Sequence, residues 1–352
     1  MDTRETALLL FVEMEKTKNF GSSLIRDTLN KYDYEDPREK AFLKRLTEGT
    51  LESLLTLDYV INAYSKTPTN KMKPLIRSLL RLSVYQILYM DTVPDSAACN
   101  EAVRLAKKKG VKTLGIVNVV GSSIAREADN VFYTLAGPEI AVATTKAYST
   151  QLIAGYCLAV QFAKVRGSID DTQYAHLIDE MQQLPDKIAK ILEDKERIQW
   201  FAAKQANAGD IFFIGRGIDY AISLEGSLKM KEISYIHSEA YAAGELKHGT
   251  ISLVEDGMPV IGVATQTELL EKTVSNIVEV KSRGAFVVLI AEPELDIEDG
   301  VADIVIKLPQ ADQLLMPMVA AVPLQLIAYY TAVLKGNDVD KPRNLAKSVT
   351  VE

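Results

Sequence analysis

Cysteine, histidine and tryptophan are scarce in this sequence, whose 352 residues include two Cys, three His and one Trp. Cys99 and Cys157 lie far apart in apolar helical surroundings, so we expect free thiols in a reducing cytoplasm and no disulfide framework. With so few ligands, we expect no metal site. No apolar run reaches the ~18 residues of a membrane span, and the first residues lack a secretory cleavage site. We therefore expect no membrane partner.

The composition is that of a globular protein, with 47% hydrophobic and 25% charged residues. The length predicts two or three domains. The net charge of −7 hides a difference along the chain: residues 1–110 carry 18 Lys and Arg against 15 Asp and Glu, whereas the remainder carries 22 against 32. This difference predicts that the two parts meet different partners.

The first 110 residues contain no pattern typical of a strand, and their apolar spacing predicts a helical bundle. The segment Asp36-Pro37-Arg38-Glu39 combines a capping Asp, a Pro at the first helical position and an acid in the first turn. Helices are predicted at 3–16, 22–31, 37–55, 57–64, 74–90 and 95–109.

Basic residues gather on part of this bundle, because the segment between Asp58 and Asp91 contains no acidic residue. Two of its arginines are spaced i,i+4 and share a helix face. Such a surface could meet an RNA phosphate backbone. Charge alone favours the alternative, an ordinary cationic helix face. The candidate RNA-binding residues are Lys71, Lys73, Arg77 and Arg81.

After Gly110 strands and helices alternate, which predicts a parallel α/β sheet. Near-continuous apolar runs mark its buried strands. The predicted strands are 112–120, 131–136, 210–215, 258–265, 285–292 and 302–308. The predicted helices are 142–165, 170–183, 186–207, 219–236, 268–283 and 314–335. Residues 209–335 supply one complete doubly wound domain, whereas 111–140 supply two strands only.

Residues 227–249, SLKMKEISYIHSEAYAAGELKHG, concentrate the groups suited to chemistry. Lysines, carboxylates and two histidines in so short a segment predict proton transfer on a small molecule. The alternative is a charged, solvated helix followed by a loop. The preceding Gly215-Arg216-Gly217 predicts a tight turn and lacks the dinucleotide fingerprint, so we expect no cofactor.

The polar C-terminal segment carries Lys347 between small residues. A lysine that reaches a closed pocket could form a Schiff base with a carbonyl substrate. The alternative is a frayed chain end.

The first 110 residues resemble the NusB-like helical domain, and are closest to the version that precedes ribosomal-RNA cytosine methyltransferases. The resemblance rests on TRETALLLFVEMEK, SSLIRDTLNK, DPREKAFLKRLTEGTLESLLTLDYVIN and RSLLRLSVYQILYMDTVPDSAACNEAVRLAKKKG. It implies RNA binding. The methyltransferase domain itself has no counterpart here, so methyltransferase chemistry is not implied.

From about residue 111 onward the chain resembles the glutamine–fructose-6-phosphate aminotransferase family. The resemblance rests on NVVGSSIAREAD, AGPEIAVATTKAYSTQL, EGSLKMKEISYIHSEAYAAGELKHG and DVDKPRNLAKSVTVE. It implies sugar isomerase (SIS) domains acting on fructose 6-phosphate, and a homodimer. The resemblance also indicates a chimera of two coding sequences, joined near residue 110.

The resemblance also implies residue roles. Glu232 matches the base that moves a proton between C1 and C2, and Lys347 the lysine that forms the imine. His248 matches a ring-opening histidine supplied by the neighbouring subunit, and Lys229 a supporting lysine near the sugar. Val142 and Ala346 match residues that line the sugar pocket, whereas His237 reads as structural and His176 as a surface residue.

Departures from the family pattern predict impaired activity. TVPDSAACN stands where the family has a Ser/Thr-rich phosphate loop, and Asp95 beside Ser96 would repel phosphate. We find no counterpart of the glutaminase domain. The predicted domains are a NusB-like domain at 1–110, a truncated first SIS domain with connecting helices at 111–208, and a second SIS domain with its C-terminal tail at 209–352. The alternative function is an RNA-binding module fused to a carbohydrate-binding scaffold.

Overall fold

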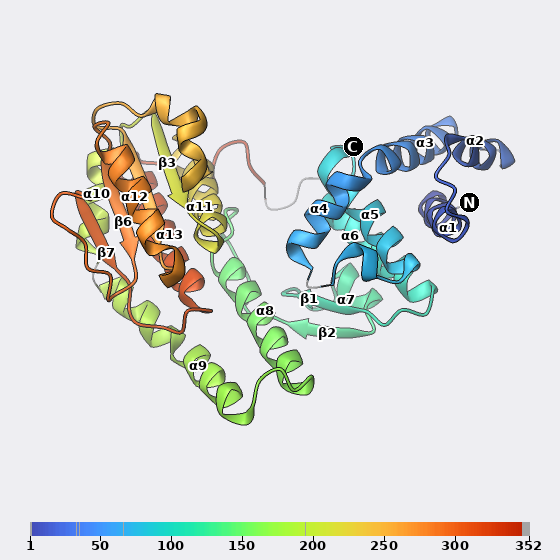
Figure 1. The fold of residues 1–352 in the computed structure, drawn as a ribbon, viewed down its shortest axis with the longest axis horizontal. Helices are drawn as coiled ribbons and strands as arrows, with labels where there is room; N and C mark the ends of the chain where they lie inside the picture. Colours follow the sequence, from blue (N-terminus) through green and yellow to red (C-terminus); the bar gives the residue numbers. More distant parts are fainter. Residues whose placement is uncertain (1, 33, 35, 66, 194, 347–352) are drawn as a thin grey trace. The chain divides into compact units, whose positions relative to one another are not determined.

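The computed structural model describes residues 2–346 apart from 33, 35, 66 and 194. The chain forms two compact units, of which one reaches to Leu135 and the other begins at Ala136. Figure 1 shows both units coloured along the chain. Assignment of residues 111–208 to the remains of a first SIS domain stays a prediction.

The first unit is a bundle of helices, as predicted. Asp2 caps its first helix by accepting the Glu5 N–H at 3.2 Å, and Asp36 caps its third by accepting the Arg38 N–H at 2.8 Å. Phe11 and Leu46 are fully buried in its core. The helices are α1 (Thr3–Thr17), α2 (Ser22–Lys31), α3 (Pro37–Glu52), α4 (Leu54–Tyr64), a 3₁₀ turn (Thr69–Lys71), α5 (Pro74–Tyr89) and α6 (Asp95–Lys108).

A two-stranded parallel sheet completes this unit. Strands β1 (Leu114–Val117) and β2 (Asn130–Tyr133) pair in parallel, with the short helix α7 (Ser123–Glu127) between them. Helix α7 lies so close to β1 that a Cβ on Gly115 would come within 3.0 Å of Ile124. The opposite face of β1 is open, since Ile116 remains 40% exposed.

A network of buried ion pairs ties α1, α4 and α5 together. Glu15, with 3% of its side chain exposed, accepts from Arg77 Nη2 at 2.5 Å and from Arg81 Nη1 at 2.9 Å. Arg81 also holds Asp58 through two bonds, at 2.6 and 2.7 Å. Charges this deep need partners, because desolvation of an unpaired charge is costly.

The second unit is a parallel sheet with helices on both sides. Its strands are β3 (Asp210–Gly215), β4 (His237–Ala242), β5 (Pro259–Ala264), β6 (Phe286–Ala291) and β7 (Ile304–Lys307). Its α-helices are α8 (Lys146–Val165), α9 (Asp171–Glu193), α10 (Glu196–Gln205), α11 (Ile218–Lys229), α12 (Leu270–Lys281) and α13 (Met316–Leu334). A π-helical turn (Met230–Ser234) and the 3₁₀ helices Ala243–His248, Thr250–Leu253 and Thr267–Leu269 complete it.

The strand order in this sheet is β4-β3-β5-β6-β7, and all its pairs are parallel. The fold class, an all-α NusB-like bundle followed by an α/β sugar isomerase domain, is confirmed. Strand β4 is not among the predicted strands, because HSEAYA lacks the apolar run of its neighbours. It pairs with β3 from Asp210↔His237 to Gly215↔Ala242.

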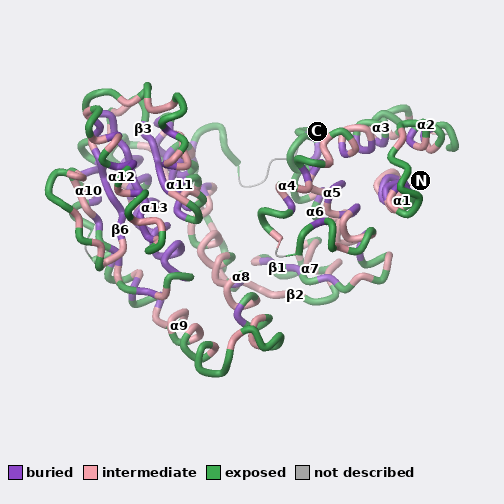
Figure 2. Tube along the Cα trace, in the orientation of Figure 1, coloured by how far each residue is buried: buried purple, intermediate pink, exposed green. Residues whose placement is uncertain are grey.

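Helix α13 is long and apolar enough to be considered as a membrane span, in contrast to our sequence expectation. However, 67% of its apolar window is buried inside the unit. Figure 2 shows β3, β6 and parts of α13 as buried segments. Its residues Val319 and Leu324 belong to the same apolar core as Phe213 on β3, so α13 is a core helix of this unit.

The turn between β3 and α11 is tight, as predicted. A Cβ on Gly215 would meet the Asp219 carbonyl carbon at 2.5 Å, and Gly217 has φ +56°. Only glycine fits both requirements without strain. Arg216 between them donates to Asn276 Oδ1 on α12 at 2.9 Å, which fixes the turn at the carboxyl edge of the sheet.

The ion network predicts that Glu15→Gln lowers the stability of the first unit by about 3 kcal/mol, because the half-buried Arg77 loses its carboxylate partner and Arg81 keeps only Asp58. Trp200, the one tryptophan, lies on α10 in the second unit. In urea the far-UV circular dichroism of the first unit should therefore unfold earlier, while the tryptophan fluorescence transition stays in place.

Glu48→Gln is the matched control. Glu48 meets Lys44 at 3.9 Å on the surface, and its loss should change stability by less than about 0.5 kcal/mol. Equal unfolding curves for the two variants would contradict the role given to Glu15.

Candidate active site

The end of α11 carries the groups that the sequence predicts to be catalytic. After Lys229 the helix continues as a π turn, and Tyr235, with φ +58°, ends it in the left-handed region. Lys229 is 3% exposed, and its Nζ donates to Glu232 Oε2 at 2.5 Å. A buried ammonium group needs such a partner, so this pair fixes the orientation of the Glu232 carboxylate.

Glu225 is a third member of this group that the sequence analysis did not single out. Its Oε1 lies 3.6 Å from Lys229 Nζ, too far for a hydrogen bond, and is buried without another partner among the described residues. Burial raises the pKa of Glu225 to about 7, with the Glu232 charge adding to the rise and Lys229 opposing it. Spacings of four residues to Lys229 and seven to Glu232 put all three on one helix face, a signal present in the sequence.

Tyr148 on α8 belongs to the same electrostatic environment. Its pKa is raised to about 12, mainly by burial and then by the nearby Glu225 charge. At neutral pH the phenol is therefore a hydrogen-bond donor and acceptor and carries no charge.

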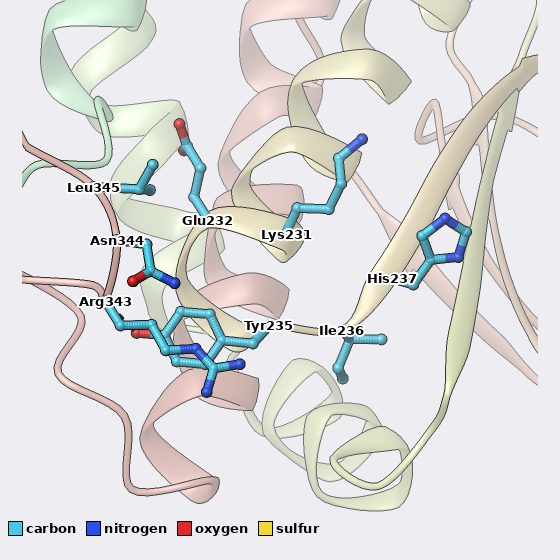
Figure 3. A pocket seen from close by; sticks show the side chains of 8 residues that line it. All are labelled: Lys231, Glu232, Tyr235, Ile236, His237, Arg343, Asn344 and Leu345. Atoms are coloured by element: carbon cyan, nitrogen blue, oxygen red, sulfur yellow. Dashed lines mark hydrogen bonds between the residues drawn. The ribbon is translucent and has the colours of Figure 1, made fainter. Parts of the chain in front are cut away.

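A pocket of about 460 Å³ opens beside Glu232. Figure 3 shows it from close by, with one wall formed by the π turn and the start of β4 and the other by the C-terminal segment. Its volume is within the range of small-molecule sites. It is lined by Lys231, Glu232, Tyr235, Ile236, His237, Arg343, Asn344 and Leu345.

Hydrogen bonds hold the C-terminal segment against this wall. Asn337 Nδ2 donates to the Ile233 carbonyl at 2.9 Å, and the Arg343 N–H donates to the Tyr235 hydroxyl at 2.7 Å. The Val142 N–H donates to the Asp340 carbonyl at 2.9 Å, so the loop that carries Val142 meets the tail.

The predicted sugar-pocket residues lie at different places along this tail. Val142 is half-buried and bonded to the tail, whereas Ala346 is exposed at the end of the described chain. Lys347, predicted to form the imine, lies outside the described residues.

His248 lies at the opposite edge of the sheet from Glu232. Glu232 precedes β4 and His248 follows it, and the strand's six residues span roughly 17–20 Å. His248 is 64% exposed and has Glu245 Oε2 at 3.9 Å. One copy of the chain therefore does not bring these two predicted groups together.

The other histidines are engaged at the surface. His237 Nδ1 is paired with Asp210, and His176 Nε2 lies 3.1 Å from Asp312 Oδ2. Among the described residues, no group of three His, Cys, Asp or Glu side chains is arranged to hold a metal ion.

The predicted RNA-binding residues divide into two pairs. Lys71 and Lys73 are exposed, whereas Arg77 and Arg81 are turned into the ion network with Glu15. The partners of the arginines come from α1 and α4, which local charge counting does not reveal. Their bonds already occupy the guanidinium edges that a phosphate would need.

Comparison with protein families finds two matches along the chain. The NusB family matches residues 1–126, and the SIS domain matches residues 205–335. A single chain thus carries segments of two families, as predicted.

Curated relatives are glutamine–fructose-6-phosphate aminotransferases (isomerizing). That of Caldanaerobacter subterraneus subsp. tengcongensis is 59% identical over 259 residues, which are 73% of this chain and 42% of the relative. That of Clostridium tetani is 55% identical over 258 residues, with the same coverage. The chain therefore spans less than half the length of these relatives.

Among solved structures, the C-terminal domain of glucosamine-fructose-6-phosphate aminotransferase from Francisella tularensis is 38% identical with a TM-score of 0.65. The match covers 72% of this chain and 71% of that domain. Through the part that follows its NusB-family segment, the chain belongs to the family of SIS-containing isomerase domains of glucosamine-fructose-6-phosphate aminotransferase.

Proposed function

We propose that this chain carries the isomerase portion of a glutamine–fructose-6-phosphate aminotransferase and acts on sugar phosphates of the fructose 6-phosphate class. The observation that carries the proposal is the Glu232 carboxylate, oriented by the buried Lys229 at 2.5 Å and facing a pocket of sugar size. The names of the relatives give the substrate class.

In this proposal Glu232 carries a proton between C1 and C2 of the open-chain sugar. Removal of the C1 proton gives an enediol, and its return to C2 converts the ketose into the aldose. Lys229 keeps the carboxylate aimed at the pocket. Lys347 would form the imine with the sugar carbonyl, as the family resemblance implies, and hydrolysis of that imine would return the carbonyl and release the lysine before the enediol forms.

The second catalytic half would come from another copy of the chain. His248 and Glu232 lie at opposite ends of β4, so a homodimer that brings the partner's His248 to the pocket would complete the site. The separation of His248 from Glu232 within one chain supports the predicted homodimer.

We further propose that turnover is slow. The segment TVPDSAACN stands in the place of the family's phosphate loop, and α6 begins in it with Asp95, an acid in the first helical turn. Each lost charge-assisted contact costs about 1.5–3 kcal/mol of binding. Conversion of fructose 6-phosphate at the rate of an intact relative would contradict this part of the proposal.

A second candidate function is RNA binding through residues 1–110. The NusB match to residues 1–126, together with exposed Lys71 and Lys73, favours it. The double variant Lys71→Glu/Lys73→Glu should weaken a salt-dependent gel shift with ribosomal-RNA fragments by about tenfold or more, because two phosphate contacts become repulsive. A matched reversal of two exposed lysines in the second unit, Lys272→Glu/Lys335→Glu, should not. Equal binding by both variants would count against RNA contact at this surface.

Deuterium incorporation at C1 of fructose 6-phosphate in heavy water is the test of the isomerase proposal, because it detects one proton transfer even when net turnover is slow. Glu232→Gln should lower the exchange rate by at least about a hundredfold. Glu271→Gln, an exposed carboxylate on α12, should leave it unchanged. An unaltered exchange rate in Glu232→Gln would contradict the assignment of Glu232 as the base.

Glu225 predicts a pH dependence of stability. Its folded pKa, about 7 against an ordinary 4.5, means that the folded state holds the proton more tightly. The contribution of Glu225 to the stability of the folded state is therefore fully present below pH 4.5 and is lost as the pH rises through 7. Glu225→Gln should gain about 2 kcal/mol relative to the wild type between pH 5 and pH 8.

Urea unfolding followed by Trp200 fluorescence measures this gain within the second unit. Glu271→Gln should keep a constant difference from the wild type over the same range. A constant difference for Glu225→Gln as well would show that its carboxyl titrates alike in both states.

A further inference from the structure

The pocket beside Glu232 carries an excess of positive charge. Lys231 and Arg343 line it from opposite walls, and in the described part of the chain neither side chain has a carboxylate partner. The negative charge of Glu232 is already balanced by Lys229. His237, at the pocket's far end, is engaged with Asp210. Figure 3 shows the Lys231 ammonium pointing away from the Arg343 guanidinium, so Arg343 is the cation available for direct contact with a ligand and Lys231 adds positive charge to the rim.

Arg343 is held in an orientation suited to an oxyanion. Its guanidinium carbon lies 4.2 Å from the centre of the Tyr235 ring, and its backbone N–H donates to the Tyr235 hydroxyl at 2.7 Å. Figure 3 shows the guanidinium lying against that ring. Stacking leaves the in-plane N–H groups free, and these form the bidentate fork that matches phosphate.

Asn344 adds a neutral amide to the same wall. Its φ of +63° lies in the left-handed region, where Asn is tolerated better than most residues. The amide lines the pocket between Arg343 and Leu345. An amide N–H₂ next to Arg343 is a further donor for an oxyanion, and its carbonyl oxygen can accept from a sugar hydroxyl.

The charge and the volume together select the ligand class. A phosphate monoester carries about −1.5 to −2 charges at pH 7, which matches two cations better than a single carboxylate does. A pocket of about 460 Å³ has room for a phosphorylated hexose whose carbon chain reaches Glu232.

We infer that Arg343, next to Asn344, binds the phosphate of a small phosphorylated sugar in this pocket, and that Lys231 strengthens the binding through its positive charge at the rim. They thereby retain part of the anchoring that the family's Ser/Thr loop supplies and that TVPDSAACN replaces. The inference rests on the proposed function for the reaction, whereas binding itself can be tested separately.

Calorimetric titration of the full chain with glucose 6-phosphate, inorganic phosphate and glucose tests it. Glucose 6-phosphate should bind, inorganic phosphate should compete with it, and glucose should bind at least about tenfold more weakly. Raising the salt concentration should weaken the phosphate ester and leave glucose unaffected. Equal affinity for glucose and its phosphate, no binding of the phosphate, or no competition by inorganic phosphate would overturn the inference.

Variants assign the contact to these residues. Arg343→Gln should weaken glucose 6-phosphate about tenfold or more, Lys231→Gln should weaken it less, and Arg343→Lys should keep part of the affinity. Both residues are exposed, so the thermal unfolding of the variants should match the wild type. Lys272→Gln, an exposed lysine on α12, is the control and should bind normally. Wild-type affinity in the Arg343→Gln/Lys231→Gln double variant would overturn the assignment.

Glu232→Gln separates this inference from the proposed reaction. It should bind glucose 6-phosphate normally and lose isotope exchange. If binding depends on Arg343 but the wild type shows no isotope exchange, the isomerase proposal is contradicted and the phosphate site stands. If exchange depends on Glu232 but binding does not depend on Arg343, the phosphate site is contradicted and the isomerase proposal stands.

Discussion

The parallel pairing of β4 with β3 determines where Lys229, Glu232 and His248 lie. Helix α11 runs back from the carboxyl end of β3 and delivers Lys229 and Glu232 to the amino end of β4. The residues after Ala242 emerge at the other edge, where a Cβ on Gly244 would lie 2.7 Å from Arg216. His248 is on that edge, so the register of one strand pair separates base and histidine by the length of a strand.

At the amino end of β4, buried charges determine the geometry of the candidate site. Lys229 is almost fully buried and is held between Glu232 at 2.5 Å and Glu225 at 3.6 Å. Burial raises the pKa of Glu225 and the nearby Glu232 charge adds to the rise, whereas Lys229 opposes it from 3.6 Å without cancelling it. The tail is held against the neighbouring π turn by the bonds of Asn337 to Ile233 and of Arg343 to Tyr235. The site therefore depends on α11, the π turn and the tail together.

Local sequence patterns predicted most elements but not the long-range partners. The helices of the first 110 residues and the apolar strands are found near their predicted bounds. Strand β4 was not predicted because its residues form a strand through pairing with β3 and not through their own strand propensity. Helix α9 continues through Pro185, where a break was expected, because Leu184 and Ile191 on either side are buried in the core. The carboxylate partners of Arg77 and Arg81 lie 23 to 66 residues away, beyond any local charge count.

The central claim is that a working site needs two copies of this chain, one giving Glu232 and the other His248. Co-expression of Glu232→Gln with His248→Gln chains, followed by measurement of C1 exchange on fructose 6-phosphate, tests it most directly. Each variant alone should be inactive, and the mixture should recover about a quarter of the wild-type rate, because half the dimers are mixed and each holds one intact site. Full exchange by His248→Gln alone, or no recovery in the mixture, would contradict the claim.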